Sequence, residues 1–230
     1  MAFNQDMIRR IYNERQPKSK KHIIYFVGAT GCGKSTKLKK LQQTYMGFYQ
    51  YITHDEIMSF LLHQPNVFAR NLSYLYLLSD RLMKAIDNAD ISNQNTIFVE
   101  GHPILSILYS QALFKSQKGV LITENDCQKL MGCYNEIMEY INGYEPFQKF
   151  HQIIYYINLP LEVNLELLQQ QRGCDDIEEN EKNELELIRR TIHSDIFNLT
   201  KQISNTKVIE VNTLMGLDIV HMYLLGRSSC

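Results

Sequence analysis

The chain has no tryptophan, five prolines and five cysteines among its 230 residues. The cysteines form an odd set without a C-x-x-C pair, which argues against disulfides and zinc and favours a reducing compartment. No apolar run approaches the length of about 18 residues that a membrane-spanning helix needs, and the first residues lack the apolar core of a signal peptide. We therefore expect an intracellular, cytoplasmic protein that has no membrane partner.

The chain also lacks an excess of charge of either sign. With 24 Lys and Arg against 25 Asp and Glu, the net charge is −1, so no overall field favours nucleic acid. Residues 1–21 are locally basic, which is more typical of a solvated leader than of a nucleic-acid arm. The remaining residues, 22–230, have the length of a single α/β domain with a full core.

One glycine-rich stretch indicates a specific chemistry. Gly28–Ser35 reads G-A-T-G-C-G-K-S and matches the phosphate-loop pattern G-x-x-x-x-G-K-[ST] in full. An apolar strand precedes the stretch and an amphipathic helix follows it, which is the context that the pattern requires. A ligand-free glycine turn is the alternative. The pattern predicts that Lys34 reaches the terminal phosphates of ATP and that the Ser35 hydroxyl ligates Mg²⁺. The expected ATP-binding residues are Gly28, Ala29, Thr30, Gly31, Cys32, Gly33, Lys34, Ser35 and Thr36.

Short apolar runs alternate with helical patterns along the rest of the chain. Continuous apolar strands are typical of a parallel sheet covered on both faces, so we predict an α/β fold with a doubly wound, five-stranded parallel sheet flanked by helices. The expected strands are His22–Val27, Phe48–Ile52, Thr96–Val99, Gln152–Ile157 and Lys207–Val211. The expected helices are Ser35–Thr44, Asp55–His63, Ala69–Asn88, Pro103–Lys115, Glu124–Asn142, Pro160–Gln170, Asn183–Gln202 and Leu217–Leu225.

Carboxylates follow two of the predicted strands. Ligands of such sheets gather at the carboxyl ends of the strands. Asp55 and Glu56 come after the second strand, where a carboxylate can prepare an acceptor hydroxyl for phosphoryl transfer, although Asp55 can instead cap the helix that begins there. Glu100 ends the third strand and can meet Mg²⁺ or its waters; a solvated strand end is the alternative.

Two arginines are further candidates. Arg81 lies in a long helical pattern and either contacts the acceptor or pairs with Asp80 at the surface. Arg172 follows the helix after the fourth strand, within a predicted lid at about 171–182, and can bring positive charge to the transferring phosphoryl group.

With these residues in view, the chain resembles the deoxynucleoside kinase superfamily of P-loop kinases, particularly the herpesvirus-type thymidine kinases, which would suit a virus-encoded protein. Besides the phosphate loop, the resemblance rests on four stretches, namely Tyr49–Glu56, Glu100–Ile104, Tyr155–Leu168, and Arg172 with Leu187–Arg190. It implies catalytic roles for Glu56, or Asp55 if the register slips by one, and for Arg172. For the acceptor, it implies a site near Glu100 and His102, with Tyr74 near the position of the family's base-reading glutamine.

The chain departs from the family at three positions. Gly101 stands where the family has an arginine that contacts the acceptor, while Gln170 and Cys174 stand where further lid arginines are usual. Fewer cations should weaken the stabilisation of the transferring phosphoryl group.

We therefore expect a kinase that uses ATP and Mg²⁺ to phosphorylate the 5′-hydroxyl of a deoxynucleoside, with thymidine favoured. Three alternatives stay open, namely a nucleoside-monophosphate kinase for an acceptor such as dTMP, a degenerate homologue that binds ATP without catalysis, and a polynucleotide 5′-kinase. The expected partner is a small nucleoside or nucleotide, a homodimer is left open, and no nucleic acid is expected.

Overall fold

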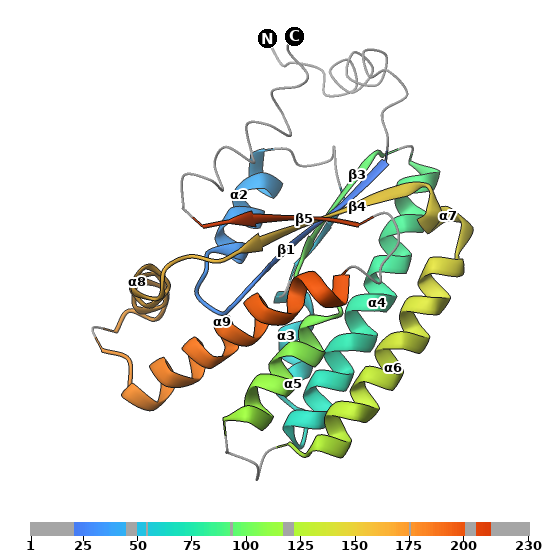
Figure 1. The fold of residues 1–230 in the computed structure, drawn as a ribbon. Coiled ribbons are helices and arrows are strands. Elements are labelled where there is room, and N and C mark those ends of the chain that lie inside the picture. The colour runs from blue at the N-terminus through green and yellow to red at the C-terminus, as the bar shows by residue number, and fades with distance from the viewer. Residues whose placement is uncertain are drawn as a thin grey trace, which may run out of the picture.

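The computed structural model describes residues 21–44, 50–53, 55–92, 94–116, 122–174, 176–200 and 206–212 (Figure 1). The predicted leader, except for Lys21, and the predicted helix Leu217–Leu225 lie outside these residues. Each of the five predicted strands is present, and together they form one parallel sheet in the order β2-β3-β1-β4-β5. The strands are β1 (Lys21–Gly28), β2 (Gln50–Ile52), β3 (Thr96–Glu100), β4 (Phe150–Ile157) and β5 (Thr206–Val211).

Helices cover both faces of this sheet, as the prediction of a doubly wound fold requires (Figure 1). The described helices are α2 (Lys34–Thr44), α3 (Asp55–Leu61), α4 (Val67–Ile91), α5 (Leu105–Lys115), α6 (Glu124–Gly143), α7 (Glu145–Gln148), α8 (Leu161–Arg172) and α9 (Glu179–Thr200). The short helix α7 was not predicted from the sequence; the others match predicted helices to within a few residues.

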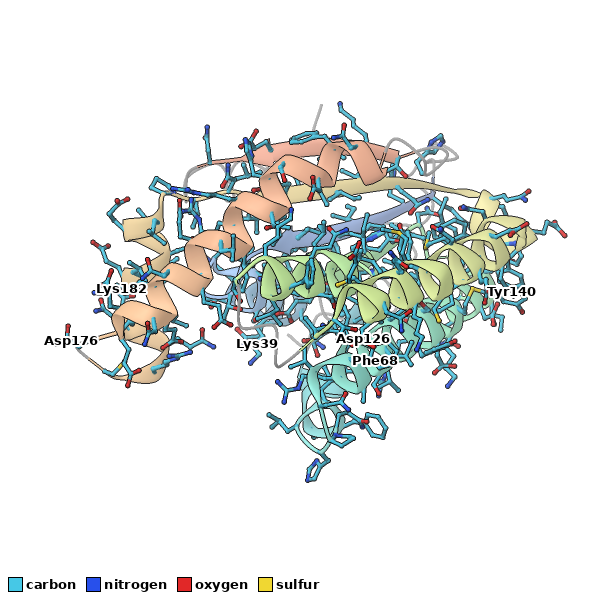
Figure 2. The ribbon with its side chains drawn as sticks, turned by 60° about the horizontal axis from the view of Figure 1, so that its bottom comes forward. Lys39, Phe68, Asp126, Tyr140, Asp176 and Lys182 are labelled. Atoms are coloured by element: carbon cyan, nitrogen blue, oxygen red, sulfur yellow. The ribbon has the colours of Figure 1, made fainter. Side chains whose placement is uncertain are left out.

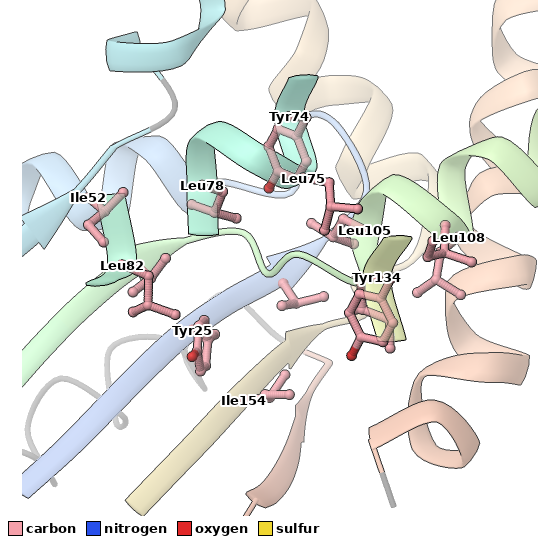
Figure 3. Close-up of a cluster of buried hydrophobic side chains, with 14 of the residues drawn as sticks. Tyr25, Ile52, Tyr74, Leu75, Leu78, Leu82, Leu105, Leu108, Tyr134 and Ile154 are labelled. Carbon is pink, nitrogen blue, oxygen red and sulfur yellow. The ribbon is translucent and has the colours of Figure 1, made fainter. Parts of the chain in front are cut away.

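Alternation along β1 divides the core into two layers. Ile24 and Phe26 point to one face, where they pack with Leu38 and Leu41 of α2. The alternate residues of β1 point to the other face, where the larger cluster gathers side chains from α4, α5, α6 and α9. Figure 3 shows part of this cluster, with labelled side chains from α4, α5 and α6 beside the sheet. Since β1 is buried on both faces between β3 and β4, its carboxyl end is held rigidly at the centre of one edge of the sheet.

Helices α4 and α5 are placed by local signals and by this core. The Asn66 side chain caps α4 by accepting a hydrogen bond of 2.8 Å from the Ala69 N–H. Leu75, Leu78 and Leu82 then recur at helical spacing and are buried against the sheet. Among the described residues, no helix combines the length and apolarity needed to cross a bilayer.

Candidate active site

The predicted phosphate loop joins β1 to α2. β1 ends at Gly28 and α2 begins at Lys34, so the strand–loop–helix arrangement is confirmed. Gly31 and Gly33 adopt positive φ angles of 77° and 84°, a conformation that glycine tolerates and that curls the loop at the helix N-terminus. Loops of this kind offer backbone N–H groups to phosphate oxygens.

Helix α8 supports the phosphate loop from the side. The buried Asn164 donates from Nδ2 to the Thr30 carbonyl over 3.3 Å. A Cβ atom on Gly31 would stand 3.0 Å from the Asn164 carbonyl oxygen and 3.1 Å from Leu168 Cβ. Asn164 carries no motif signal, so only the packing of α8 against the loop identifies it as a supporting residue.

We expect Gly31→Ala to lower the free energy of unfolding by about 1–3 kcal/mol, because it combines a positive φ with a tight contact to the backbone of α8. Thermal or urea unfolding measures the change. Gly132→Ala is the matched control, since Gly132 lies within α6 with open space around it and should gain about 0.5–1 kcal/mol. Equal effects of the two substitutions would contradict this description of the loop.

The Lys34 ammonium lies inside the loop that precedes it. Its Nζ donates to the carbonyl oxygens of Gly28 at 2.9 Å and Ala29 at 2.7 Å, and it lies 3.4 Å from Cys32 Sγ. Burial alone would lower the pKa of Lys34, but the neighbouring Cys32, Tyr109 and Glu100 outweigh burial and raise the pKa. Lys34 therefore stays cationic at neutral pH, which the predicted contact with phosphates would require.

Ser35 and Glu100 meet beside the loop. The register pairs Glu100 at the end of β3 with Phe26 of β1, which brings the carboxylate level with the start of the loop. The Ser35 hydroxyl donates to Glu100 Oε1, and the Glu100 side chain is only 3% exposed. Two oxygen donors of this kind suit Mg²⁺, which usually takes one or two protein ligands and completes its shell with waters and substrate phosphates. Within the described residues, no group of three or more His, Cys, Asp or Glu side chains forms a self-sufficient metal site.

Asp55 and Glu56 occupy the first turn of α3, which follows β2. Ile52 of β2 pairs with Val99 of β3, so α3 starts at the same edge of the sheet as Glu100. Two strand spacings, about 10 Å, separate β2 from β1. The directions of the Asp55 and Glu56 side chains lie outside what the structure describes, so the choice between them as catalytic carboxylate stays a prediction.

The structure of the turn after β3 shows why position 101 has a glycine where the resembling family has an arginine. Gly101 has a positive φ of 93°, and a Cβ atom there would stand 2.1 Å from the Tyr74 hydroxyl oxygen. The space of a side chain at 101 is therefore taken by Tyr74 from α4. His102, next in the chain, turns its ring into the core against Tyr25, with 4.5 Å between the ring centroids.

The His102 ring is neutral. Burial lowers the pKa of His102 to about 3, and its Nδ1 accepts a hydrogen bond of 3.1 Å from the Ile104 N–H. Acceptor binding by His102 stays a prediction; what the geometry displays is support of the turn that follows Glu100.

The predicted acceptor contact Arg81 lies on α4, and Tyr109, which was not predicted, lies on α5. Arg81 is half-buried and lies seven residues after Tyr74 on α4, a rise of about 10 Å along the helix. Tyr109 of α5 is half-buried and close enough to Lys34 and Tyr74 to affect the pKa of each. The sequence offered no signal for Tyr109, because it is one of the 14 tyrosines of the chain and lies outside the motifs described above.

Arg172 is the last residue of α8 and lies on the side of this helix that packs against the phosphate loop. It follows Asn164 and Leu168 at intervals of four residues, so the three residues share one side of the helix. Its guanidinium pairs with Glu181 of α9 at 2.6 Å, and this bond raises the pKa of Arg172. Asp176 and Lys182 mark the end of the molecule where α8 and α9 meet (Figure 2). The predicted lid is thus the connection between these helices, with its arginine bound to a glutamate.

Comparison with known proteins supports the fold described above. Neither a protein-family model nor a curated protein matches the chain. A solved structure of deoxyadenosine kinase from M. mycoides, with the products dCMP and a flexible dCDP bound, is similar with a TM-score of 0.54 and 13% identity. The similarity covers 89% of this chain and 99% of that chain. The chain therefore has a deoxyadenosine kinase-like fold. A structure of the same kinase with bound dATP gives a TM-score of 0.52 at 12% identity, with the same coverage of both chains.

This deoxyadenosine kinase-like fold confirms the fold class that the sequence predicted, and it confirms the resemblance to deoxynucleoside kinases at the level of the fold. At 13% identity the comparison does not reach individual side chains. Residue roles therefore depend on the contacts described above.

Proposed function

We propose that this protein is an ATP-dependent kinase that phosphorylates the 5′-hydroxyl of a deoxynucleoside, with thymidine as the favoured acceptor. The observation that carries the proposal is the meeting of a cationic Lys34 with the Ser35–Glu100 pair at the carboxyl edge of the sheet. The deoxyadenosine kinase-like fold supports it, since the similar structures hold deoxynucleotides.

The donor half of the site binds and neutralises a triphosphate. Loop N–H groups and the Lys34 ammonium hold the phosphates, with Lys34 exchanging its loop carbonyls for phosphate oxygens. Ser35 and Glu100 would hold Mg²⁺, which would supply positive charge to offset the charge of the phosphates.

The acceptor half positions a hydroxyl for in-line attack. Glu56, or Asp55 in the alternative register, orients the 5′-hydroxyl and accepts its proton as the new O–P bond forms, while the bond between the γ-phosphorus and the β,γ-bridging oxygen breaks and ADP leaves. Arg172 adds charge to the transferring phosphoryl group once it leaves Glu181. Arg81 is proposed as an acceptor contact farther along α4.

A panel of acceptors tests this function. Deoxynucleosides, ribonucleosides, deoxynucleoside monophosphates and a 5′-hydroxyl oligonucleotide are each incubated with γ-labelled ATP and MgCl₂. Label in a deoxynucleoside monophosphate is the expected result. Label transferred only to dTMP or another monophosphate would favour the monophosphate kinase, and label on the oligonucleotide would favour the polynucleotide kinase. ATP binding with no transfer to any acceptor would favour the non-catalytic homologue and contradict the proposal.

Removing the ion pair that Arg172 makes with Glu181 should slightly lower the KM for ATP. We expect Glu181→Gln to lower the KM for ATP by up to about five-fold, because exposed ion pairs are worth at most about 1 kcal/mol. Steady-state kinetics at low salt measures the change. Glu179→Gln is the control, since Glu179 pairs with Lys182 instead. A higher KM in Glu181→Gln would show that the pair orders the lid rather than holding it from the phosphates.

A further inference from the structure

Tyr74 places its hydroxyl group in the turn after β3, at the position where Gly101 has no side chain. The carboxylate proposed to hold Mg²⁺ belongs to Glu100, and the next residue is a glycine with a φ of 93°. Because Gly101 has no side chain, it makes no side-chain contacts that could fix the direction of the neighbouring Glu100 carboxylate. Its backbone N–H donates to the Phe26 carbonyl at 2.9 Å, which fixes one side of the turn to β1.

The Tyr74 hydroxyl fixes the other side. It comes so close to Gly101 that it would lie 2.1 Å from a Cβ atom at that position. The backbone of His102 also hydrogen-bonds to it. The ring extends from α4 with its hydroxyl on the side of the chain that follows β3 (Figure 3). The hydroxyl therefore contacts the backbone on the far side of Glu100, where a side chain at 101 would otherwise lie.

The Tyr74 hydroxyl also lies within the electrostatic reach of Glu100. Burial is the largest cause of the raised pKa of Tyr74, and its electrostatic interactions with Tyr109 and Glu100 raise it further. Tyr74 is thus a neutral phenol at every pH at which the protein would work. A neutral hydroxyl at this place forms no ion pair with the Glu100 carboxylate. A cation here would form one and would compete with Mg²⁺ for that carboxylate.

We infer that Tyr74 is a positioning residue for Glu100, occupying the side-chain space of Gly101 and holding the Glu100 carboxylate where Ser35 meets it. This role rests on the proposed function, because it assumes that Glu100 helps to hold Mg²⁺ with the triphosphate. Groups that orient a metal ligand typically change metal affinity by about 10–100-fold when they are removed.

The test compares Tyr74→Phe with Tyr134→Phe in the full chain. Both substitutions keep a buried ring and remove one hydroxyl, but the Tyr134 hydroxyl belongs to α6 and has no hydrogen-bond partner in the described part of the chain. Titration calorimetry measures ATP binding with MgCl₂ and with EDTA. We expect Mg²⁺ to strengthen ATP binding equally in the wild type and Tyr134→Phe, and about ten-fold less in Tyr74→Phe. Binding in EDTA should stay the same in all three proteins.

An equal effect of Mg²⁺ in Tyr74→Phe and the wild type would overturn the inference, whatever the acceptor panel gives. This includes the case in which Tyr74→Phe only lowers the melting temperature, since that is the result of a purely structural role. If Tyr74→Phe does not fold, Gly101→Ala provides the second variant, because its Cβ would displace the Tyr74 hydroxyl. The same loss of the Mg²⁺ effect is expected there, and an unchanged effect would contradict the role of Tyr74. The binding assay uses no acceptor, so it can succeed or fail independently of the proposed transfer reaction.

Discussion

Lys34→Ala is expected to lower kcat/KM for ATP by about 10²–10³-fold and to weaken ATP binding to a similar degree. The ammonium lies within the loop, bonded to the Gly28 and Ala29 carbonyls, and its raised pKa keeps it charged. Its removal takes away the positive charge that the loop offers to the triphosphate. The carbonyl oxygens of Gly28 and Ala29 also lose the ammonium group that donates hydrogen bonds to them. Calorimetry with ATP and initial rates with the best acceptor of the panel measure the two effects.

Lys149→Ala is the charge-matched control for this substitution. Lys149 pairs with Asp90 just before β4, at the opposite edge of the sheet from the loop, so ATP binding should not change. Near-normal ATP binding by Lys34→Ala would mean that the loop does not hold the phosphates in the proposed way.

Glu56→Gln should reduce kcat by about 10²–10⁴-fold while the KM for ATP changes little, since a general base acts on the acceptor. The substitution keeps the size and the helical preference of the residue and removes only its charge. Asp55→Asn is the matched substitution one position earlier in the same first turn of α3, and it should leave turnover and stability nearly unchanged if Asp55 only caps the helix, because Asn caps about as well as Asp.

The opposite result has a definite meaning. A large loss of kcat in Asp55→Asn together with normal turnover in Glu56→Gln would assign the base to Asp55, as in the alternative register. Normal turnover in both variants would remove this pair from the mechanism altogether.

The phosphate loop and Glu100 could be predicted from the sequence because their positions follow from local rules. Glycines at fixed spacing between a strand and a helix determine the loop backbone, and Gly31 and Gly33 adopt the expected positive φ. Glu100 ends an apolar strand, and parallel pairing of β3 with β1 brings it to Ser35. The strands were predicted for the same reason, since buried parallel strands are continuous apolar runs.

The supporting residues could not be predicted, because contacts between distant elements place them. Asn164 reaches the loop only because α8 packs beside it, and Tyr109 interacts electrostatically with Lys34 only because α5 follows the turn after β3. Gly101 was recognised from the sequence as a departure from the family. Its explanation required the structure, since the atoms that fill its side-chain space belong to Tyr74 on another helix.

The transfer of labelled phosphate from γ-labelled ATP to a deoxynucleoside is the measurement that tests the account most directly. With wild-type protein, MgCl₂ and each deoxynucleoside in turn, the account predicts label in a 5′-monophosphate, with thymidine among the acceptors, and no such product from Lys34→Ala. Label that stays in ATP, or that appears only as inorganic phosphate whatever the acceptor, would contradict the claim that this site transfers phosphate to a hydroxyl.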